Sequence, residues 1–217
     1  MPQAMTFTSL QNDVRSYLER GASAVTDPIV YAQIPNLITL AERRISRDLK
    51  IQGFQTVVVT NLQAGVAVLP KPDRWRETIS MNIGTGLNNN TRAQVFTRDY
   101  EYCRSYWPDE TEVDQPLFYA DYNYSNWLLV PTPDQDYPIE ILYYELPALL
   151  DENNQTNWLT EFAPNLLLYA TLLEATPFLK NDERIPVWQG MYAQAAQALQ
   201  NEDMQKVLDR GAVRNEA

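Results

Sequence analysis

The chain has 217 residues and 45% of them are hydrophobic, so it can bury a core as one domain, or as one domain with a sizeable insertion. Its formal net charge of −11 argues against a nucleic-acid-binding surface, which needs a basic patch. It contains no histidine, which excludes Ser-His-Asp and Cys-His catalysis and removes the commonest transition-metal ligand. The one cysteine, Cys103, cannot form an internal disulfide or a zinc cluster, and we interpret it as a half-buried side chain.

The amino-terminal region predicts a short amphipathic helix. The opening sequence MPQAMTFTSL has neither a basic nor a long apolar stretch, so we expect no secretory signal, which fits synthesis in a reducing cytoplasm. The segment Thr8–Gln11 has the form of a capping box, which predicts a helix over residues 9–20. Gly21 is expected to end it.

A second helix is expected from Pro28 to about residue 50, with Asp27 as its cap. Pro35 is expected to split off a short first piece of this helix. Its polar face carries three arginines, Arg43, Arg44 and Arg47. These side chains form a solvated stripe, or they contact acidic residues of a neighbouring subunit.

From residue 51 the hydrophobic pattern changes from helical to alternating, which is typical of strands. Seven runs predict strands, at residues 54–59, 66–69, 78–83, 93–96, 117–121, 127–130 and 139–144. A turn at residues 61–65 separates the first two runs, and residues 97–107 predict a short helix. Gly84 to Asn90 indicates a hairpin tip, not a phosphate-binding loop, because the strand-to-helix context is missing.

The most apolar segment of the chain is residues 157–179. Its apolar residues recur at helical spacing, namely Trp158, Phe162, Leu166, Leu167, Leu168, Tyr169, Leu172 and Leu173. We expect a core helix buried on several sides, with Pro164 in its first turn and Pro177 weakening its end. Its polar interruptions make it unsuited to span a membrane.

A final helix is expected after Asn181 and Asp182, which would cap it. One face of this helix carries Trp188, Met191, Tyr192, Ala195 and Leu199. A polar run follows at residues 200–205, and the composition of residues 207–217 predicts a mobile tail.

The sequence offers little support for catalysis or metal binding. Acidic residues gather in the loop at 108–114, but nothing apolar surrounds them to raise a pKa. Residues 121–125 begin like a calcium loop, yet the required glycine and bidentate glutamate are absent. We therefore expect no enzyme, and no catalytic, cofactor-binding or metal-binding residue. Four aromatic residues either form a glycan-binding surface or pack across adjacent strands, namely Tyr119, Tyr122, Tyr124 and Trp127.

Four motifs in the second half of the chain carry a resemblance to a known family. They are PLFYA (116–120), IEILYYELPALL (139–150), TNWLTEFAPNLLLYATLLEA (156–175) and ERIPVWQGMY (183–192). Together they resemble the head-to-tail adaptors of tailed bacteriophages, and TLAERRISRDLK (39–50) is in the same style. The resemblance implies a helical bundle with an inserted β domain, in a ring, usually twelve-fold, that docks under the portal and continues the DNA channel. It implies no catalytic residue.

The predicted fold is therefore α+β. A bundle of about four helices from residues 1–51 and 147–217 is interrupted by an antiparallel β-rich domain at residues 52–146. The predicted protein is a structural virion component at the head–tail junction, which joins the portal to a tail or nozzle protein. DNA would pass through the lumen of the ring without sequence-specific binding, and a negatively charged lumen fits that role. No cofactor and no membrane are expected.

Two sets of candidate residues follow from this prediction. By analogy with related connectors, the carboxy-terminal tail would dock on the portal through Val207, Leu208, Arg210, Val213 and Arg214. Contacts between subunits are expected at Arg43, Arg44, Arg47, Leu168 and Trp188. Two other interpretations stay open, a glycan-binding or glycan-cleaving tail component and a tail-terminator protein.

Overall fold

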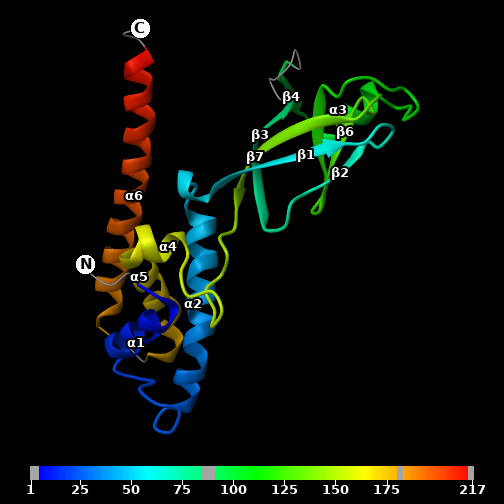
Figure 1. The fold of residues 1–217 in the computed structure, drawn as a ribbon. Coiled ribbons are helices and arrows are strands. Elements are labelled where there is room, and N and C mark those ends of the chain that lie inside the picture. The colour runs from blue at the N-terminus through cyan, green and yellow to red at the C-terminus, as the bar shows by residue number, and fades with distance from the viewer. Residues whose placement is uncertain (1–4, 85–90, 180–182, 215–217) are drawn as a thin grey trace. The chain divides into compact units, whose positions relative to one another are not determined.

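The computed structural model describes residues 5–84, 91–179 and 183–214, with side chains described as far as residue 205. It confirms the predicted α+β class. The chain divides into two compact units, a helical unit of Met1–Phe54 with Pro147–Ala217 and a β unit of Gln55–Leu146 (Figure 1). The hairpin tip predicted around Gly86 lies outside the described residues.

The helical unit is built from both ends of the chain. Its elements are α1 (Phe7–Leu18), α2 (Pro28–Asp48), the 3-10 helix η1 (Gln52–Phe54), α4 (Trp158–Phe162), α5 (Pro164–Glu174), the 3-10 helix η2 (Thr176–Phe178) and α6 (Ile185–Arg214). A bundle of about four helices is not confirmed, because the described residues of this unit form five α-helices. The apolar segment at 157–179 accounts for the difference, since it is divided into α4, α5 and η2.

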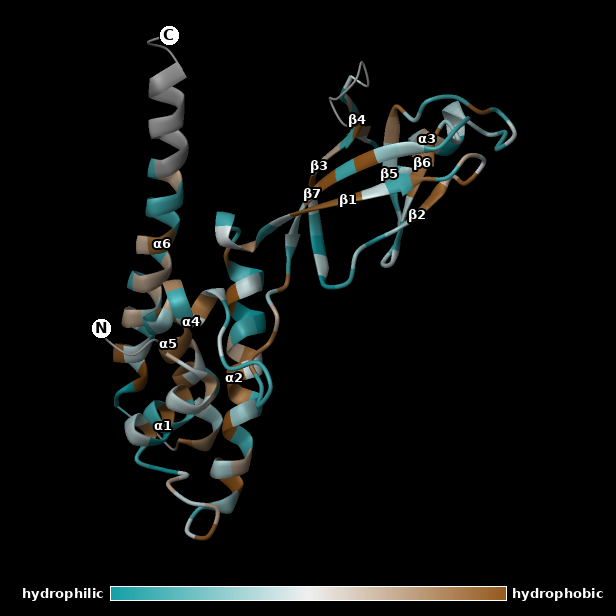
Figure 2. Ribbon diagram, viewed as in Figure 1, coloured by the Kyte–Doolittle hydropathy of each residue, from teal (hydrophilic) through white to brown (hydrophobic). Residues whose placement is uncertain are grey.

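Helix α5 is the centre of the helical unit, as its composition predicts. It packs against α1, α2, α4 and α6. Six of its residues are buried, namely Leu166, Leu167, Leu168, Ala170, Thr171 and Leu172. The Thr171 hydroxyl donates a hydrogen bond of 2.8 Å to the carbonyl oxygen of Leu167, so its burial leaves no unpaired donor. Figure 2 shows hydrophobic residues gathered in and around α5.

The start of α1 differs from the prediction. The capping box is formed by Thr6 and Ser9, because the Ser9 N–H donates to the Thr6 hydroxyl at 3.1 Å and the Thr6 N–H donates to Ser9 Oγ at 2.8 Å. The helix therefore begins at Phe7, which places the Phe7 side chain in the core. It ends at Leu18, before the expected stop at Gly21.

The prediction that Pro35 divides the second helix is wrong. Helix α2 runs unbroken from Pro28 to Asp48. The missing N–H of an internal proline costs about 3 kcal/mol. Burial of apolar side chains on both sides of Pro35, such as Ile34 and Leu37, offsets this cost.

All seven predicted strands are present in the β unit. They are β1 (Gln55–Leu62), β2 (Val68–Pro70), β3 (Trp75–Ile83), β4 (Ala93–Thr97), β5 (Phe118–Asn123), β6 (Asn126–Val130) and β7 (Tyr137–Glu145). They form one sheet in the order β1-β7-β3-β4-β5-β6-β2. Most neighbours are antiparallel, but β4 and β5 are parallel, because α3 (Tyr100–Tyr106) and the acidic loop separate them in the chain.

The first two strands follow each other in the chain but do not pair with each other. β1 pairs with β7 and β2 pairs with β6, so consecutive strands lie at opposite edges of the sheet. Because only residues 63–67 connect these two edges, the sheet must curl. One face of the curled sheet encloses a core of eleven buried residues, with Met81, Trp127 and Ile139 fully buried. A smaller cluster around Cys103 and Leu128 lies under α3, and Cys103 is therefore buried, not half-buried.

Candidate interaction surfaces

The arginine stripe of α2 is only partly available to another molecule. Arg44 points to the neighbouring helix α5, where its Nε lies 2.7 Å from Oε1 of Glu174. Both side chains are largely shielded from solvent, so this ion pair stabilises the contact between α2 and α5. Arg43 is exposed. Arg47 is 68% exposed and lies 3.5 Å from the carboxylate of adjacent Asp48, a pairing that contributes little. Arg43 and Arg47 are thus the two exposed cations of the stripe.

The two apolar candidates for subunit contacts lie inside the chain's own core. Leu168 is 7% exposed and Trp188 is 4% exposed. Their apolar character is accounted for by packing within one helical unit, and direct contact with a neighbouring subunit stays a prediction. Phe162, which was expected on the buried face of the core helix, is instead 65% exposed. It is the last residue of the short helix α4, which is separated from α5 by Ala163.

Helix α6 leaves the core of the helical unit part of the way along its length. Trp188 is buried, and Tyr192, Ala195 and Leu199 are half-buried, whereas Met191 lies off this face and is 43% exposed. At Asp203 a carboxylate oxygen still accepts a hydrogen bond of 2.7 Å from the N–H of Gln52. The next residue of the helix, Met204, is exposed to solvent.

The segment expected to be a mobile tail is helical as far as Arg214. All five candidate docking residues, Val207, Leu208, Arg210, Val213 and Arg214, therefore lie in the last turns of α6, and their side chains are outside the described part. These turns run past the other helices of the unit (Figure 1).

A tyrosine–carboxylate contact fixes the described part of α6 against α2. The Tyr192 hydroxyl donates a hydrogen bond of 3.2 Å to Oδ2 of Asp48. Burial, together with the neighbouring Asp48 carboxylate, raises the pKa of Tyr192 to about 12. The hydroxyl is therefore a hydrogen-bond donor at any physiological pH.

A shallow groove separates α6 from the start of α5. Its volume is about 200 Å³, and Phe162 and Pro164 line one side while Ala198 and Leu199 line the other. The small alanine side chains of α6 leave this space open.

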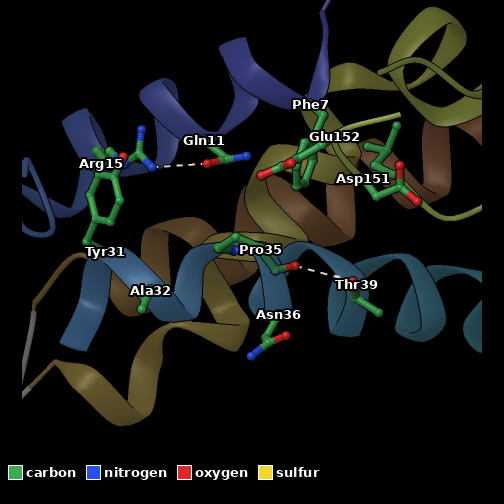
Figure 3. Close-up of a pocket in the computed structure, with 11 residues that line it drawn as sticks. Phe7, Gln11, Arg15, Tyr31, Ala32, Pro35, Asn36, Thr39, Asp151 and Glu152 are labelled. Carbon is green, nitrogen blue, oxygen red and sulfur yellow. Dashed lines mark hydrogen bonds between the residues drawn. The ribbon is translucent and has the colours of Figure 1, made fainter. Parts of the chain in front are cut away.

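A larger cleft of about 350 Å³ lies between α1, α2 and the loop at 150–152 (Figure 3). Arg15 of α1 lies over Tyr31 of α2, with its guanidinium carbon 4.2 Å from the ring centroid. Its Nη2 donates to Oε1 of Gln11 at 3.0 Å. Asp151 and Glu152 line the cleft from the loop. Sequence reasoning missed this cleft, because its lining comes from segments more than 100 residues apart.

Glu42 is a fully buried carboxyl group that sequence reasoning did not single out. Its Oε1 accepts a hydrogen bond of 2.6 Å from Asn157 Nδ2, and both its oxygens lie 3.2 Å from the N–H of Leu150. Burial raises its pKa to about 7, against the opposing effect of these hydrogen bonds. Because the group has no solvent exposure, it ties α2 to the segment at 150–157 and cannot reach a substrate.

The acidic loop of the β unit is a solvated surface. Asp109, Glu110, Glu112 and Asp114 are all exposed. Hydrogen bonds from the Thr111 hydroxyl and N–H lower the pKa of Asp109, which is the opposite of what a general acid needs. Within the described ranges, no group of three or more Cys, Asp or Glu side chains is placed to hold a metal ion.

The four aromatic residues considered as a glycan-binding surface do not share one surface. Trp127 is fully buried and Tyr119 is 7% exposed, whereas Tyr122 and Tyr124 are 43% and 84% exposed. The structure brings Trp127 edge-to-face against Trp75, with ring centroids 6.0 Å apart. Tyr119 and Trp127 therefore belong to the core of the β unit. The contact between Trp127 of β6 and Trp75 of β3 joins strands that are not neighbours in the sheet, so it differs from the packing across adjacent strands that was the alternative.

Beside this aromatic pair lies Lys71, whose side chain is 3% exposed. Its Nζ is 2.7 Å from Oδ1 of Asp121 and 3.7 Å from the centroid of the Trp75 ring. An ion pair and a cation–π contact thus hold the lysine at the edge of the core. Sequence reasoning missed this lysine, because a loop lysine between two prolines is more often exposed to solvent.

Comparison with known proteins assigns the chain to a family. Among the helices of the part that is described, none has the length and apolar character needed to cross a membrane. No curated protein matches the sequence. The family described as SU10 adaptor protein matches residues 5–214, which is nearly the whole chain. This match confirms the resemblance carried by the four motifs, and the chain belongs to the SU10 adaptor protein family of bacteriophage adaptors.

Proposed function

We propose that this protein is a structural, non-enzymatic virion component that forms a ring under the portal, joins it to a tail or nozzle protein and continues the DNA channel. The observation that carries the proposal is the family match over residues 5–214. Adaptor proteins associate with other virion components, and the proposal names the portal and the tail as those components. The ring would be twelve-fold, to match the portal.

The end of α6 is the proposed portal-docking element. The helix continues for more than two turns after Asp203, the last residue with a described bond to the rest of the unit. The end of an α-helix can bind in a groove on another protein. Val207, Leu208 and Val213 would supply apolar contacts there, and Arg210 and Arg214 would supply charge.

Contacts between subunits are proposed at the exposed part of the α2 stripe. Arg43 and Arg47 would meet acidic side chains of the neighbouring subunit, since the chain carries 28 acidic residues against 17 basic ones. Leu168 and Trp188 would act indirectly, by holding α5 and α6 in place beneath that surface.

The charge balance supports a DNA conduit. Residues 55–146 contain 13 acidic and six basic residues, so the β unit is the more acidic part of the chain. A channel lined by negative charge repels phosphate and lets DNA slide without binding.

Native mass spectrometry of the purified chain, alone and mixed with its cognate portal, tests the proposal. We expect the full chain to form a ring on the portal, and a variant without Val207–Ala217 to keep its helical and β circular dichroism but to bind the portal more weakly. Unchanged affinity of the truncated chain would overturn the docking element. Absence of any association between the full chain and the portal would overturn the adaptor role itself. The double variant Arg43→Ala/Arg47→Ala serves as the matched control, because it should weaken ring closure and leave portal docking of single subunits intact.

A further inference from the structure

Strand β1 is a long edge strand. It pairs with β7 along all eight residues, from Gln55 opposite Tyr144 to Leu62 opposite Tyr137, without a bulge. Within the described residues, β7 is the only strand that pairs with it. Every second N–H and C=O of β1 therefore points away from the sheet. The opposite edge is different, because β2 has three residues and ends at Pro70.

β1 lacks the devices that usually protect an edge. Natural edges carry charged side chains, prolines or bulges that prevent pairing with another chain. β1 contains no charged residue and no proline. Val57 and Val59 are 54% and 64% exposed, on the same face as half-buried Leu142 of β7. Figure 2 shows hydrophobic residues along part of this strand. The edge is thus apolar, free of bulges and open to another strand.

The sequence of β1 is self-complementary in the antiparallel direction. Residues 55–61 read Gln-Thr-Val-Val-Val-Thr-Asn, which is nearly the same sequence in both directions about Val58. A two-fold axis at Val58 would place Val57 opposite Val59 of the second copy and Thr56 opposite Thr60. The amides of Gln55 and Asn61 would also face each other. Pairs of β-branched residues and pairs of threonines are favourable cross-strand neighbours, and no like charges meet.

We propose that β1 pairs with β1 of a second copy of this chain, antiparallel about a two-fold axis at Val58, so that two seven-stranded sheets join into one. The pairing satisfies the open backbone groups of both edges. It also forms an apolar row from the two Val57–Val59 pairs and the two Leu142 side chains. The contact is closed and isologous, whereas a ring of more than two subunits needs a head-to-tail contact. It is therefore independent of the ring surface and does not rest on the proposed function.

Sedimentation of the full chain over a concentration series tests the pairing. One strand edge is smaller than a standard interface, so the series should extend from roughly 10 μM to 1 mM. We expect the mass to rise from the 25.0 kDa of one chain toward twice that value. Val59→Lys should remain a monomer, because the exposed position tolerates lysine but the paired edge does not. Val25→Lys, at a position 90% exposed in the helical unit, should behave as wild type.

Cysteine cross-linking tests the register. Directly opposite residues of an antiparallel pair have Cα atoms about 4.5–5.5 Å apart, within disulfide range, so Val58→Cys should give a covalent dimer on oxidation. Val57→Cys is the matched control, because the two cysteines would be offset by two residues, roughly 8 Å apart, and should not join. Cys103 is buried and does not compete.

The outcomes separate this proposal from its competitors. A chain that stays monomeric over the whole series would overturn it, and so would equal cross-linking at positions 57 and 58. Rings that form equally well with Val59→Lys, without a dimer in either protein, would overturn the pairing while leaving the adaptor role intact. If wild type is monomeric and Val59→Lys loses only portal binding, the strand partner belongs to another protein and the second-copy pairing is wrong.

Discussion

The two units each bury a group that can carry charge, and they accommodate it differently. In the helical unit Glu42 is surrounded by neutral donors, the Asn157 amide and the Leu150 N–H, so burial raises its pKa to about 7. In the β unit Lys71 lies against the Asp121 carboxylate and the face of Trp75. A buried carboxyl group with only neutral partners couples its protonation to folding. The stability of the helical unit should therefore depend on pH through Glu42.

The largest expected effect on stability comes from a second buried carboxylate in the helical unit, at a position where no hydrogen-bond donor faces it. Leu168→Asp places a charge in the core at a position that is 7% exposed. Because no hydrogen bonds such as those to Glu42 compensate it, the cost should be about 4 kcal/mol or more. Amide hydrogen exchange should show protection lost in α5 and retained in β3 and β7. A soluble Leu168→Asp protein that assembles correctly would contradict this expectation, and Leu168→Met is the matched control.

Next in size is the pH dependence that Glu42 confers. Its pKa is raised in the folded state from 4.5 to about 7, so the folded protein binds more protons than the unfolded one between these values. The stability that this group contributes is present below pH 4.5 and is lost as the pH rises through 7. The loss should be roughly 3 kcal/mol, at about 1.4 kcal/mol per pKa unit. Urea unfolding at pH 4.5, 6 and 8 should show this decline in wild type and a flatter profile in Glu42→Gln. Parallel profiles for the two proteins would show that Glu42 does not titrate in this range.

A glycine in each unit sharpens the comparison further. In the helical unit, a Cβ at Gly53 would overlap the indole ring of Trp158, which also packs against Phe54. Gly53→Ala should therefore lower the free energy of unfolding by about 2 kcal/mol through overpacking. Trp158→Leu in the same chain should recover part of the loss, which a double-mutant cycle by thermal unfolding would measure.

Gly65 of the β unit is the control for Gly53. It has open space around it but a φ of +75°, so Gly65→Ala should cost about 1 kcal/mol through backbone strain, with no rescue by any neighbour. For Gly53, the predicted overlap with Trp158 would be wrong if the effects of Gly53→Ala and Trp158→Leu on the free energy of unfolding were additive.

The smallest effect on stability is expected when the buried charge of the β unit, that of Lys71, is removed. Lys71→Met keeps the apolar stem beside Trp75 and leaves Asp121, which is 69% exposed, to be solvated by water. The loss in the free energy of unfolding should be about 1 kcal/mol, the value of a cation–π contact of this kind. Urea unfolding followed by tryptophan fluorescence measures it. An unchanged free energy of unfolding in Lys71→Met would show that the contacts of Lys71 contribute nothing to stability.

Much of the fold followed from patterns within short stretches of the chain. Short apolar runs, some β-branched and some alternating with polar residues, predicted all seven strands. The dense apolar spacing around Leu167 predicted a helix buried on several sides. Pro164 was correctly placed in a first turn. Each of these features depends on which face of one element is apolar, and that is local information. The motifs in the second half of the chain were sufficient to indicate the adaptor family.

The partners of each element were decided only by the tertiary structure. The separation of β1 and β2 to opposite edges, and the parallel pairing of β4 with β5, depend on strands far away in sequence. The burial of Glu42 and the pairing of Arg44 with Glu174 depend on α5 and the segment at 150–157, which join α2 only after the whole β unit has intervened. Periodicity shows which side of an element is apolar, but it does not show what covers that side. The sequence by itself therefore determined the elements and the family, whereas the cleft, the buried carboxyl group and the open edge of β1 arose from contacts between distant segments.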